Sequence, residues 1–277
     1  MRRTLLFVIL LSSALHSAAQ VPPGNQWIDY SLQYWKFSIV ADGLYRIDST
    51  ALADAGFPIT TIDPQELMVF GREQQVPIYI EDGGDGVLNG ADFIEFQAKK
   101  NDGWLDAQLY AQPSFQPNPY YSLYNDTINY FITWSATAQK ERVVPYVNTD
   151  FAGHTPRPWY WGETISSLTG IYRMGYNQPN GVAVTSGFYV EGEGRLHQAA
   201  ITSNSPNGAS QPHTILTPRA YQGPDAPDAR VSTAVASLNY QTANNLLDHH
   251  SVISYGPAPG TEMVDSIFNG VHTIKAD

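Results

Sequence analysis

The chain of 277 residues contains no cysteine. It can therefore form no disulfide bond, and it offers no thiol for nucleophilic catalysis or metal binding. Its stability must come from the size of its hydrophobic core. The length is sufficient for one large or two medium domains.

Basic residues are also scarce. Lys and Arg together number 15, against 26 Asp and Glu, which gives a formal net charge of −11. An acidic surface repels a phosphate backbone, so the composition argues against nucleic acid as a partner. The same acidity favours the solubility of an exported protein.

Long apolar runs are missing except near the N-terminus. Arg2 and Arg3 precede an apolar stretch over residues 5–15, and Ser17-Ala18-Ala19 supplies the small residues of a cleavage site. This pattern predicts a secretory signal peptide over residues 1–19. The apolar stretch is shorter than the roughly 18 residues that a transmembrane helix needs, so we expect the exported chain to have no transmembrane segment.

Charged residues make up only 15% of the chain and aromatic residues 12%, while Gly and Pro are frequent. This composition favours strands and turns and predicts a mainly β fold. One short helix is expected over residues 50–55, with Asp48 or Ser49 as its N-cap. Gly56 should end this helix, and Pro58 should prevent its continuation.

The first half is expected to contain several strands. Asp42-Gly43, between the apolar runs 35–40 and 44–47, predicts a hairpin. Pro77 places the strand that contains it at a sheet edge or at a strand start. The remaining strands expected in this half span residues 67–70, 76–80, 93–96 and 130–134.

The composition shifts near residue 145, where we expect a domain boundary. Residues 20–145 are predicted to form an N-terminal mixed β domain, and residues 146–277 a β-sandwich of short strands and polar turns. Asn269-Gly270 predicts a hairpin turn with its return strand at 271–274. Because a sandwich that lacks its last strands exposes an unpaired edge, we expect this sandwich to be incomplete and the chain to be the front part of a longer protein. Other strands are expected at 182–184, 188–190, 198–202, 234–240 and 251–255.

Five motifs occur in a fixed order in the first half. They are DGLYRIDSTALADAGFP at 42–58, IDPQELMVFG at 62–71, VPIYIEDGGDGVLNGADFIEF at 76–96, KKNDGWLDAQLY at 99–110 and YYSLYNDTINYFITW at 120–134. In this order and spacing they resemble the N-terminal region of gingipain-family cysteine peptidases. The resemblance is closest to the sortase-like (PorU-type) proteins of the type IX secretion system of Bacteroidetes. It covers residues 36–134 and is much vaguer beyond them.

The resemblance implies a location and a role. Proteins of this family are exported and act in the periplasm, at the outer membrane or at the cell surface. Their catalytic domain has a caspase-like α/β fold with a His-Cys dyad, which in the sortase-like members removes a C-terminal sorting domain from cargo. This chain has no Cys, so no catalytic residue can be carried over. The resemblance therefore implies a non-catalytic front portion whose partners are a downstream peptidase domain of the same protein and outer-membrane secretion components.

An acidic, Gly-rich loop lies within residues 81–95. Ca²⁺ prefers several oxygen ligands on a tight turn, and Asp82, Asp85, Asn89 and Asp92 are the predicted ligands. Their spacing does not fit an EF-hand loop. The alternative is a solvated Gly-rich turn between two strands, in which case the chain needs no cofactor.

The seven histidines are scattered along the chain. His249 and His250 are adjacent, so in a strand they would face opposite sides and would rarely share one metal. No carboxylate or histidine lies at a useful spacing from the other candidates, which are His154, His197, His213 and His272. The sequence also has no G-x-S-x-G motif, which argues against a serine hydrolase.

Two aromatic clusters support an alternative function. They are Trp159-Tyr160-Trp161 and the group Tyr120, Tyr121 and Tyr124. Exposed aromatic rings can stack on sugar rings, so the chain could be a secreted carbohydrate- or cell-surface-binding β module. The competing interpretation is that these rings pack in a core or an interface. Their exposure distinguishes the two.

Overall fold

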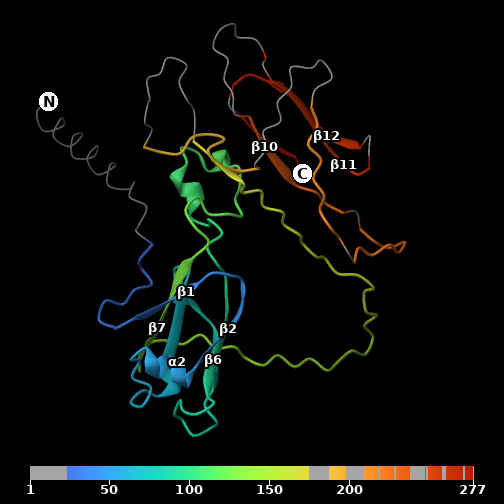
Figure 1. The fold of residues 1–277 in the computed structure, drawn as a ribbon. Helices are drawn as coiled ribbons and strands as arrows, with labels where there is room; N and C mark the ends of the chain where they lie inside the picture. The colour runs from blue at the N-terminus through green and yellow to red at the C-terminus, as the bar shows by residue number, and fades with distance from the viewer. Residues whose placement is uncertain are drawn as a thin grey trace, which may run out of the picture. The chain divides into compact units, whose positions relative to one another are not determined.

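The computed structural model describes residues 24–174, 187–197, 209–217, 219–227, 229–237, 247, 249–257, 260–270 and 272–276. In these ranges the protein is mainly β, with several antiparallel sheets and one short α-helix, which confirms the expected fold class (Figure 1). The predicted signal peptide lies outside the described residues. No helix in the described part of the chain is long and apolar enough to cross a membrane.

The chain divides into two compact units. Unit 1 comprises Met1–Lys99 and Ile128–Tyr146, and unit 2 comprises Lys100–Thr127 and Val147–Asp277. Residues 100–127, which hold most of the KKNDGWLDAQLY motif, therefore leave unit 1 and fold with unit 2. We call residues 100–127 the turn segment.

Unit 1 consists of two antiparallel sheets. The first has the strand order β1-β7-β3-β4, and the second has the order β2-β6-β5. The strands are β1 (Trp35–Ile39), β2 (Gly43–Asp48), β3 (Leu67–Gly71), β4 (Gln74–Val76), β5 (Ile78–Glu81), β6 (Phe93–Ala98) and β7 (Ile128–Trp134). Fully buried side chains of both sheets, among them Val69 and Ile132 of the first and Ile94 and Phe96 of the second, form one core. The two sheets thus pack face to face.

The first sheet is buried on its outer face as well. Trp27 packs on Phe70 and on Phe131, with ring centroids 5.3 Å apart in both pairs. The Thr133 hydroxyl donates a hydrogen bond to the Gln33 carbonyl oxygen at 2.7 Å. These contacts hold the segment before β1 against the sheet. Because the sheet is thus covered on both faces, the sequence of β3 is an unbroken apolar run.

The helix α2 (Ser49–Asp54) forms as the sequence predicts. Asp48 is its N-cap, and one carboxylate oxygen accepts a hydrogen bond from the Ala51 amide at 2.7 Å. Gly56 follows with a φ of 72°, a conformation that favours glycine. The helix buries Leu52 in the core of unit 1.

The predicted hairpin at Asp42-Gly43 is wrong. Strand β1 pairs with β7, and strand β2 pairs with β6, so the chain passes from one sheet to the other at this turn. The physical reason is that both strands bury apolar side chains in the same core from opposite sides. Phe37 of β1 and Tyr45 of β2 both contact the Phe96 ring, at 5.6 Å and 6.2 Å.

A second change of sheet occurs at Pro77. Strand β4 ends at Val76 on the edge of the first sheet, and β5 begins at Ile78 in the second sheet. This agrees with the expectation that Pro77 lies at an edge or a strand start. The tight turn is instead between β3 and β4, where Arg72 and Glu73 adopt φ values of 53° and 64°.

Unit 2 contains three two-stranded antiparallel sheets in its described residues, β8-β9, β10-β13 and β11-β12. The strands are β8 (Ile171–Arg173), β9 (Gly194–Leu196), β10 (Thr233–Ala236), β11 (His249–Tyr255), β12 (Thr261–Phe268) and β13 (Thr273–Ala276). Ile253 of β11 and Ile274 of β13 belong to one apolar cluster, so the last two sheets share a core. Across both units, the described residues also form the 3-10 helices η1 (Pro64–Glu66), η2 (Asp106–Leu109) and η3 (Pro113–Phe115).

The hairpin predicted at Asn269-Gly270 is also wrong, because β12 pairs with β11 whereas β13 pairs with β10. The chain again changes sheets at the turn. Of the other expected strands, residues 188–190 contain only an isolated bridge, between Tyr110 and Tyr189. The strands expected at 182–184 and 198–202 lie outside the described residues.

Two glycines of unit 1 give a matched test of its packing. A Cβ atom on Gly71 would overlap the Tyr130 ring, whereas one on Gly43 would meet no atom within 4 Å. We expect Gly71→Ala to lower the free energy of unfolding by about 1–3 kcal/mol through overpacking. Gly43→Ala should change it by no more than about 0.5 kcal/mol. Denaturant unfolding measures both, and equal effects would contradict the packing described for Tyr130.

Candidate functional site

The turn segment begins with two side-chain-stabilised turns. The Asn101 side-chain oxygen accepts a hydrogen bond from the Gly103 amide, and an Asp102 carboxylate oxygen accepts one from the Trp104 amide, both at 3.1 Å. Gly103 has a φ of 78°, and a Cβ atom there would lie 2.9 Å from an Asp106 carboxylate oxygen. The position therefore requires glycine for its backbone conformation and for its neighbour.

Asp106 closes the turn segment. Its side chain is buried, since the residue is only 7% exposed, and Oδ2 accepts a hydrogen bond from the Leu123 amide at 2.7 Å. The Asn101 amide also donates to the Asp126 carbonyl oxygen at 3.0 Å. The two ends of the segment are thus held together by a buried carboxylate and a backbone hydrogen bond.

Four tyrosines and one glutamate connect the turn segment to the rest of unit 2. We call this group, Tyr110, Tyr124, Tyr172, Tyr189 and Glu193, the tyrosine joint. The Tyr110 hydroxyl donates to the Glu193 carbonyl oxygen at 2.6 Å, and the Tyr172 hydroxyl donates to a Glu193 carboxylate oxygen at 3.2 Å. Tyr124 and Tyr189 share a hydrogen bond of 3.0 Å between their hydroxyls. Two backbone hydrogen bonds, both 2.9 Å, join residues 109 and 111 to Tyr189.

The joint changes the acidity of its phenols. Burial, with the adjacent Glu193 carboxylate, raises the pKa of Tyr172 to about 12. Burial and the same carboxylate raise the pKa of Tyr110 even further above its usual range. Both hydroxyls therefore remain protonated donors at physiological pH.

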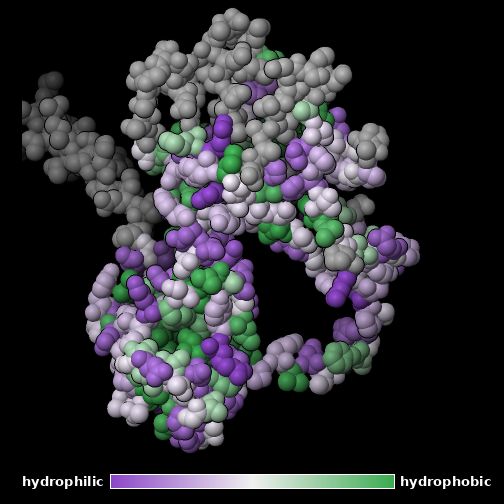
Figure 2. All heavy atoms as spheres, in the orientation of Figure 1, coloured by the Kyte–Doolittle hydropathy of each residue, from purple (hydrophilic) through white to green (hydrophobic). Residues whose placement is uncertain are grey.

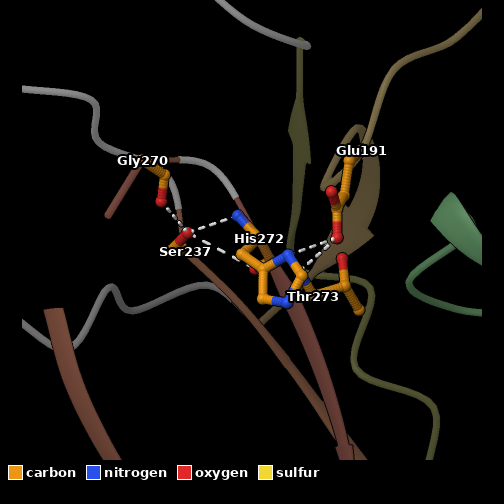
Figure 3. A network of polar contacts seen from close by, with 5 residues as sticks. All are labelled: Glu191, Ser237, Gly270, His272 and Thr273. Carbon is orange, nitrogen blue, oxygen red and sulfur yellow. Dashed lines mark hydrogen bonds and ion pairs between the residues drawn. The ribbon is translucent and has the colours of Figure 1, made fainter. Parts of the chain in front are cut away.

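A polar network lies where β10 ends and β13 begins, and its residues point toward one another (Figure 3). The Glu191 Oε1 atom accepts a hydrogen bond from the Thr273 amide at 2.7 Å and lies 3.0 Å from His272 Nδ1, with which it can form an ion pair. The Ser237 hydroxyl donates to the Gly270 carbonyl oxygen and accepts from the His272 amide, each at 2.7 Å. The network ties the Glu191 turn to the start of β13.

Serine, histidine and glutamate in one network do not make a catalytic triad here. A triad needs the serine hydroxyl on the imidazole nitrogen that does not face the carboxylate. The buried Ser237 hydroxyl instead contacts the backbone of Gly270 and His272. Its role is to fix the end of the β10-β13 sheet.

The expectation that His272 has no carboxylate partner is wrong, because Glu191 lies 3.0 Å from it. Likewise, the rings of His197 and His213 lie 5.6 Å apart, edge to face. These residues are far apart in the sequence, so no local spacing could have indicated the contacts. Glu191 and His272 come together only when the strands between them fold.

The histidines of β11 face opposite sides, as expected. His249 stacks on Phe268 with ring centroids 5.0 Å apart. His250 lies on the exposed side, and its Nε2 atom is 2.7 Å from an Asp265 carboxylate oxygen. One metal ion cannot take both.

In the acidic loop, the predicted calcium ligands are used to hold turns. Asp82 accepts from the Gly84 amide at 3.0 Å, Asp85 from the Val87 amide at 3.0 Å, and Asp92 from the Asn89 amide at 2.8 Å. Within the described ranges, no group of three or more His, Asp or Glu side chains is placed to hold a metal ion. The solvated-turn interpretation accounts for these contacts, and calcium binding stays a prediction.

The aromatic clusters differ in exposure. Tyr160 is 81% exposed and Trp161 is 60% exposed, while Trp159 packs against Trp161 at an interplanar angle of 79°. Tyr124 is exposed but is bound into the tyrosine joint, and Lys100 lies over the Tyr121 ring at 5.9 Å. The first cluster presents its rings to solvent, and in the second cluster Tyr120 is 49% exposed.

A cavity of about 290 Å³ opens beside the polar network. Its lining residues are Ser114, Phe115, Glu191, His272, Thr273 and Lys275, all in unit 2. The lining combines a hydroxyl, an aromatic ring, a carboxylate, an imidazole and an ammonium group.

Comparison with known proteins finds no relative, because no family model, curated protein or solved structure matches the chain.

Asp106 allows a direct test of the closed turn segment. Replacing it with alanine leaves the buried Leu123 amide without an acceptor, so we expect Asp106→Ala to lower the free energy of unfolding of unit 2 by about 1–3 kcal/mol. Asp150→Ala is the matched control, because Asp150 also accepts from a backbone amide, at 3.2 Å, but is exposed. Hydrogen exchange at Leu123 and denaturant unfolding measure the effect. Unchanged exchange at Leu123 would contradict it.

The tyrosine joint predicts a dependence on alkaline pH. Folding raises the pKa of Tyr172 from 10.0 to about 12, so the folded protein holds this proton more tightly than the unfolded chain. The stability that results is complete below about pH 10 and is lost as the pH rises toward 12. Phenolate absorbance should show a late titration step that Tyr172→Phe makes smaller. A titration curve unchanged by the substitution would show that the joint does not form.

Proposed function

We propose that this chain is the non-catalytic N-terminal portion of a secreted gingipain-like cysteine peptidase or sortase-like protein of type IX secretion. In this role it docks and positions a peptidase domain that follows it. Its further partners would be outer-membrane secretion components, and it would act in the periplasm, at the outer membrane or at the cell surface.

The observation that carries the proposal is that the motif residues serve as caps, turns and core. Asp48 caps α2, Asp63 caps η1, and Asp106 closes the turn segment. Such residues fix a shape, as a positioning module requires. In the described ranges, the single cluster that combines Ser, His and Glu lacks the geometry for nucleophilic attack.

A second observation supports docking. Large apolar side chains are exposed along residues 147–165 of unit 2, including Val147 at 80%, Tyr160 at 81% and Trp161 at 60%. Along this stretch, which Figure 1 draws in yellow-green, Figure 2 shows green, apolar atoms among purple and white ones. Exposed apolar side chains gathered in one stretch are typical of a surface that another protein covers.

The alternative function is a secreted carbohydrate- or cell-surface-binding β module. The exposure of Tyr160 and Trp161 favours it, because solvent-facing rings can stack on sugars. The perpendicular packing of Trp159 against Trp161 argues against a flat stacking platform. We therefore prefer the docking role for this stretch.

Reading the open reading frame beyond Asp277 tests the proposal. We expect it to continue into an α/β domain with a paired His and Cys, and we expect the present chain alone to cleave no peptide. A frame that closes at Asp277, or that continues only into further β modules, would overturn the peptidase proposal and favour the alternative.

A further inference from the structure

The cavity beside the polar network is built by three stretches of unit 2 that are distant in sequence. Ser114 and Phe115 come from η3 in the turn segment, Glu191 comes from the turn before β9, and Thr273 and Lys275 come from β13. Folding of the turn segment onto unit 2 is therefore required to complete it. None of these residues has a part in the proposed docking surface.

The polar groups of the cavity are held in fixed positions. Glu191 Oε1 accepts from the Thr273 amide and lies 3.0 Å from His272 Nδ1, so the carboxylate and the imidazole orient each other. Within the described residues, His272 Nε2 has no hydrogen-bond partner. The Thr273 hydroxyl oxygen is buried and is likewise unpaired among them. Buried polar atoms are normally hydrogen-bonded, so an unpaired one beside a cavity points to a ligand or water that completes it.

The charges of the lining restrict the class of ligand. Glu191 would repel an anion, and Lys275 would repel a cation. A neutral molecule with several hydroxyl groups is repelled by neither side chain. Each of its hydroxyls can donate a hydrogen bond to the carboxylate and accept one from the ammonium or the imidazole. The half-buried Phe115 ring adds an apolar surface on which a ring can stack.

We propose that this cavity binds a single neutral saccharide ring. Phe115 stacks on one face of the sugar, Glu191 accepts from its hydroxyls, and Lys275 and the His272 Nε2 atom bond to them. Ligand pockets for drug-sized molecules run from about 300 to 1,000 Å³, so a cavity of about 290 Å³ suits one sugar ring. The inference does not rest on the proposed peptidase role, since its residues and its test are separate from the docking surface.

The test is saturation-transfer NMR on the exported chain with four sugars offered singly: D-galactose, D-mannose, L-rhamnose and N-acetyl-D-glucosamine. Inorganic phosphate and choline serve as charged comparison probes. We expect at least one sugar to bind and both charged probes to fail. Phe115→Ala and Lys275→Met should each weaken the binding by about tenfold, equivalent to roughly 1.4 kcal/mol.

His250→Gln is the matched control, because His250 also pairs with a carboxylate but does not line the cavity. It should leave sugar binding unchanged. Lys275→Met removes a charge from an exposed side chain outside the hydrogen-bonded network, so an unaltered unfolding curve shows that the variant folds. The proposal is overturned if no sugar binds, if phosphate or choline binds instead, or if both cavity variants bind sugar as the parent does.

Discussion

The buried carboxylate of Asp106 is the interaction on which unit 2 depends. By accepting the Leu123 amide at 2.7 Å, it closes the turn segment around Gly103, where no side chain fits. Only a closed segment can present Tyr110 to the Glu193 carbonyl oxygen and Phe115 to the cavity. The KKNDGWLDAQLY motif thus helps to fold the 28 residues of the turn segment without a disulfide.

Many of the acidic and amide side chains of this chain stabilise turns. Carboxylates and side-chain amides repeatedly accept the backbone amide two residues further on, as Asp82, Asn101 and Asn118 do. Such turns need an acceptor at the first position and no regular secondary structure. An acidic, Gly-rich sequence can therefore reflect turn formation rather than metal binding, which explains why composition alone could not decide between calcium and a solvated turn in the loop around Asp85.

Local features were predictable and long-range ones were not. The helix α2 follows from a cap and a terminating glycine within nine residues, and the alternation of His249 and His250 follows from strand geometry. Asp42-Gly43 and Asn269-Gly270 correctly mark turns, but a turn does not determine whether its flanking strands pair. Burial of apolar side chains in the shared cores determines which strands pair. The contact of Glu191 with His272, and therefore the cavity, likewise exists only after the strands between them have assembled.

The most direct test of the proposed docking role is the binding of the purified chain to the His-Cys domain that the proposal expects after Asp277. That domain would be expressed separately, and binding would be measured by calorimetry. We expect saturable one-to-one binding that Val147→Asp weakens. Leu44→Asp should leave it unchanged, since Leu44 is similarly exposed, at 68%, but belongs to unit 1, whereas residues 147–165 belong to unit 2. No binding, or equal loss in both variants, would contradict a docking surface on this stretch.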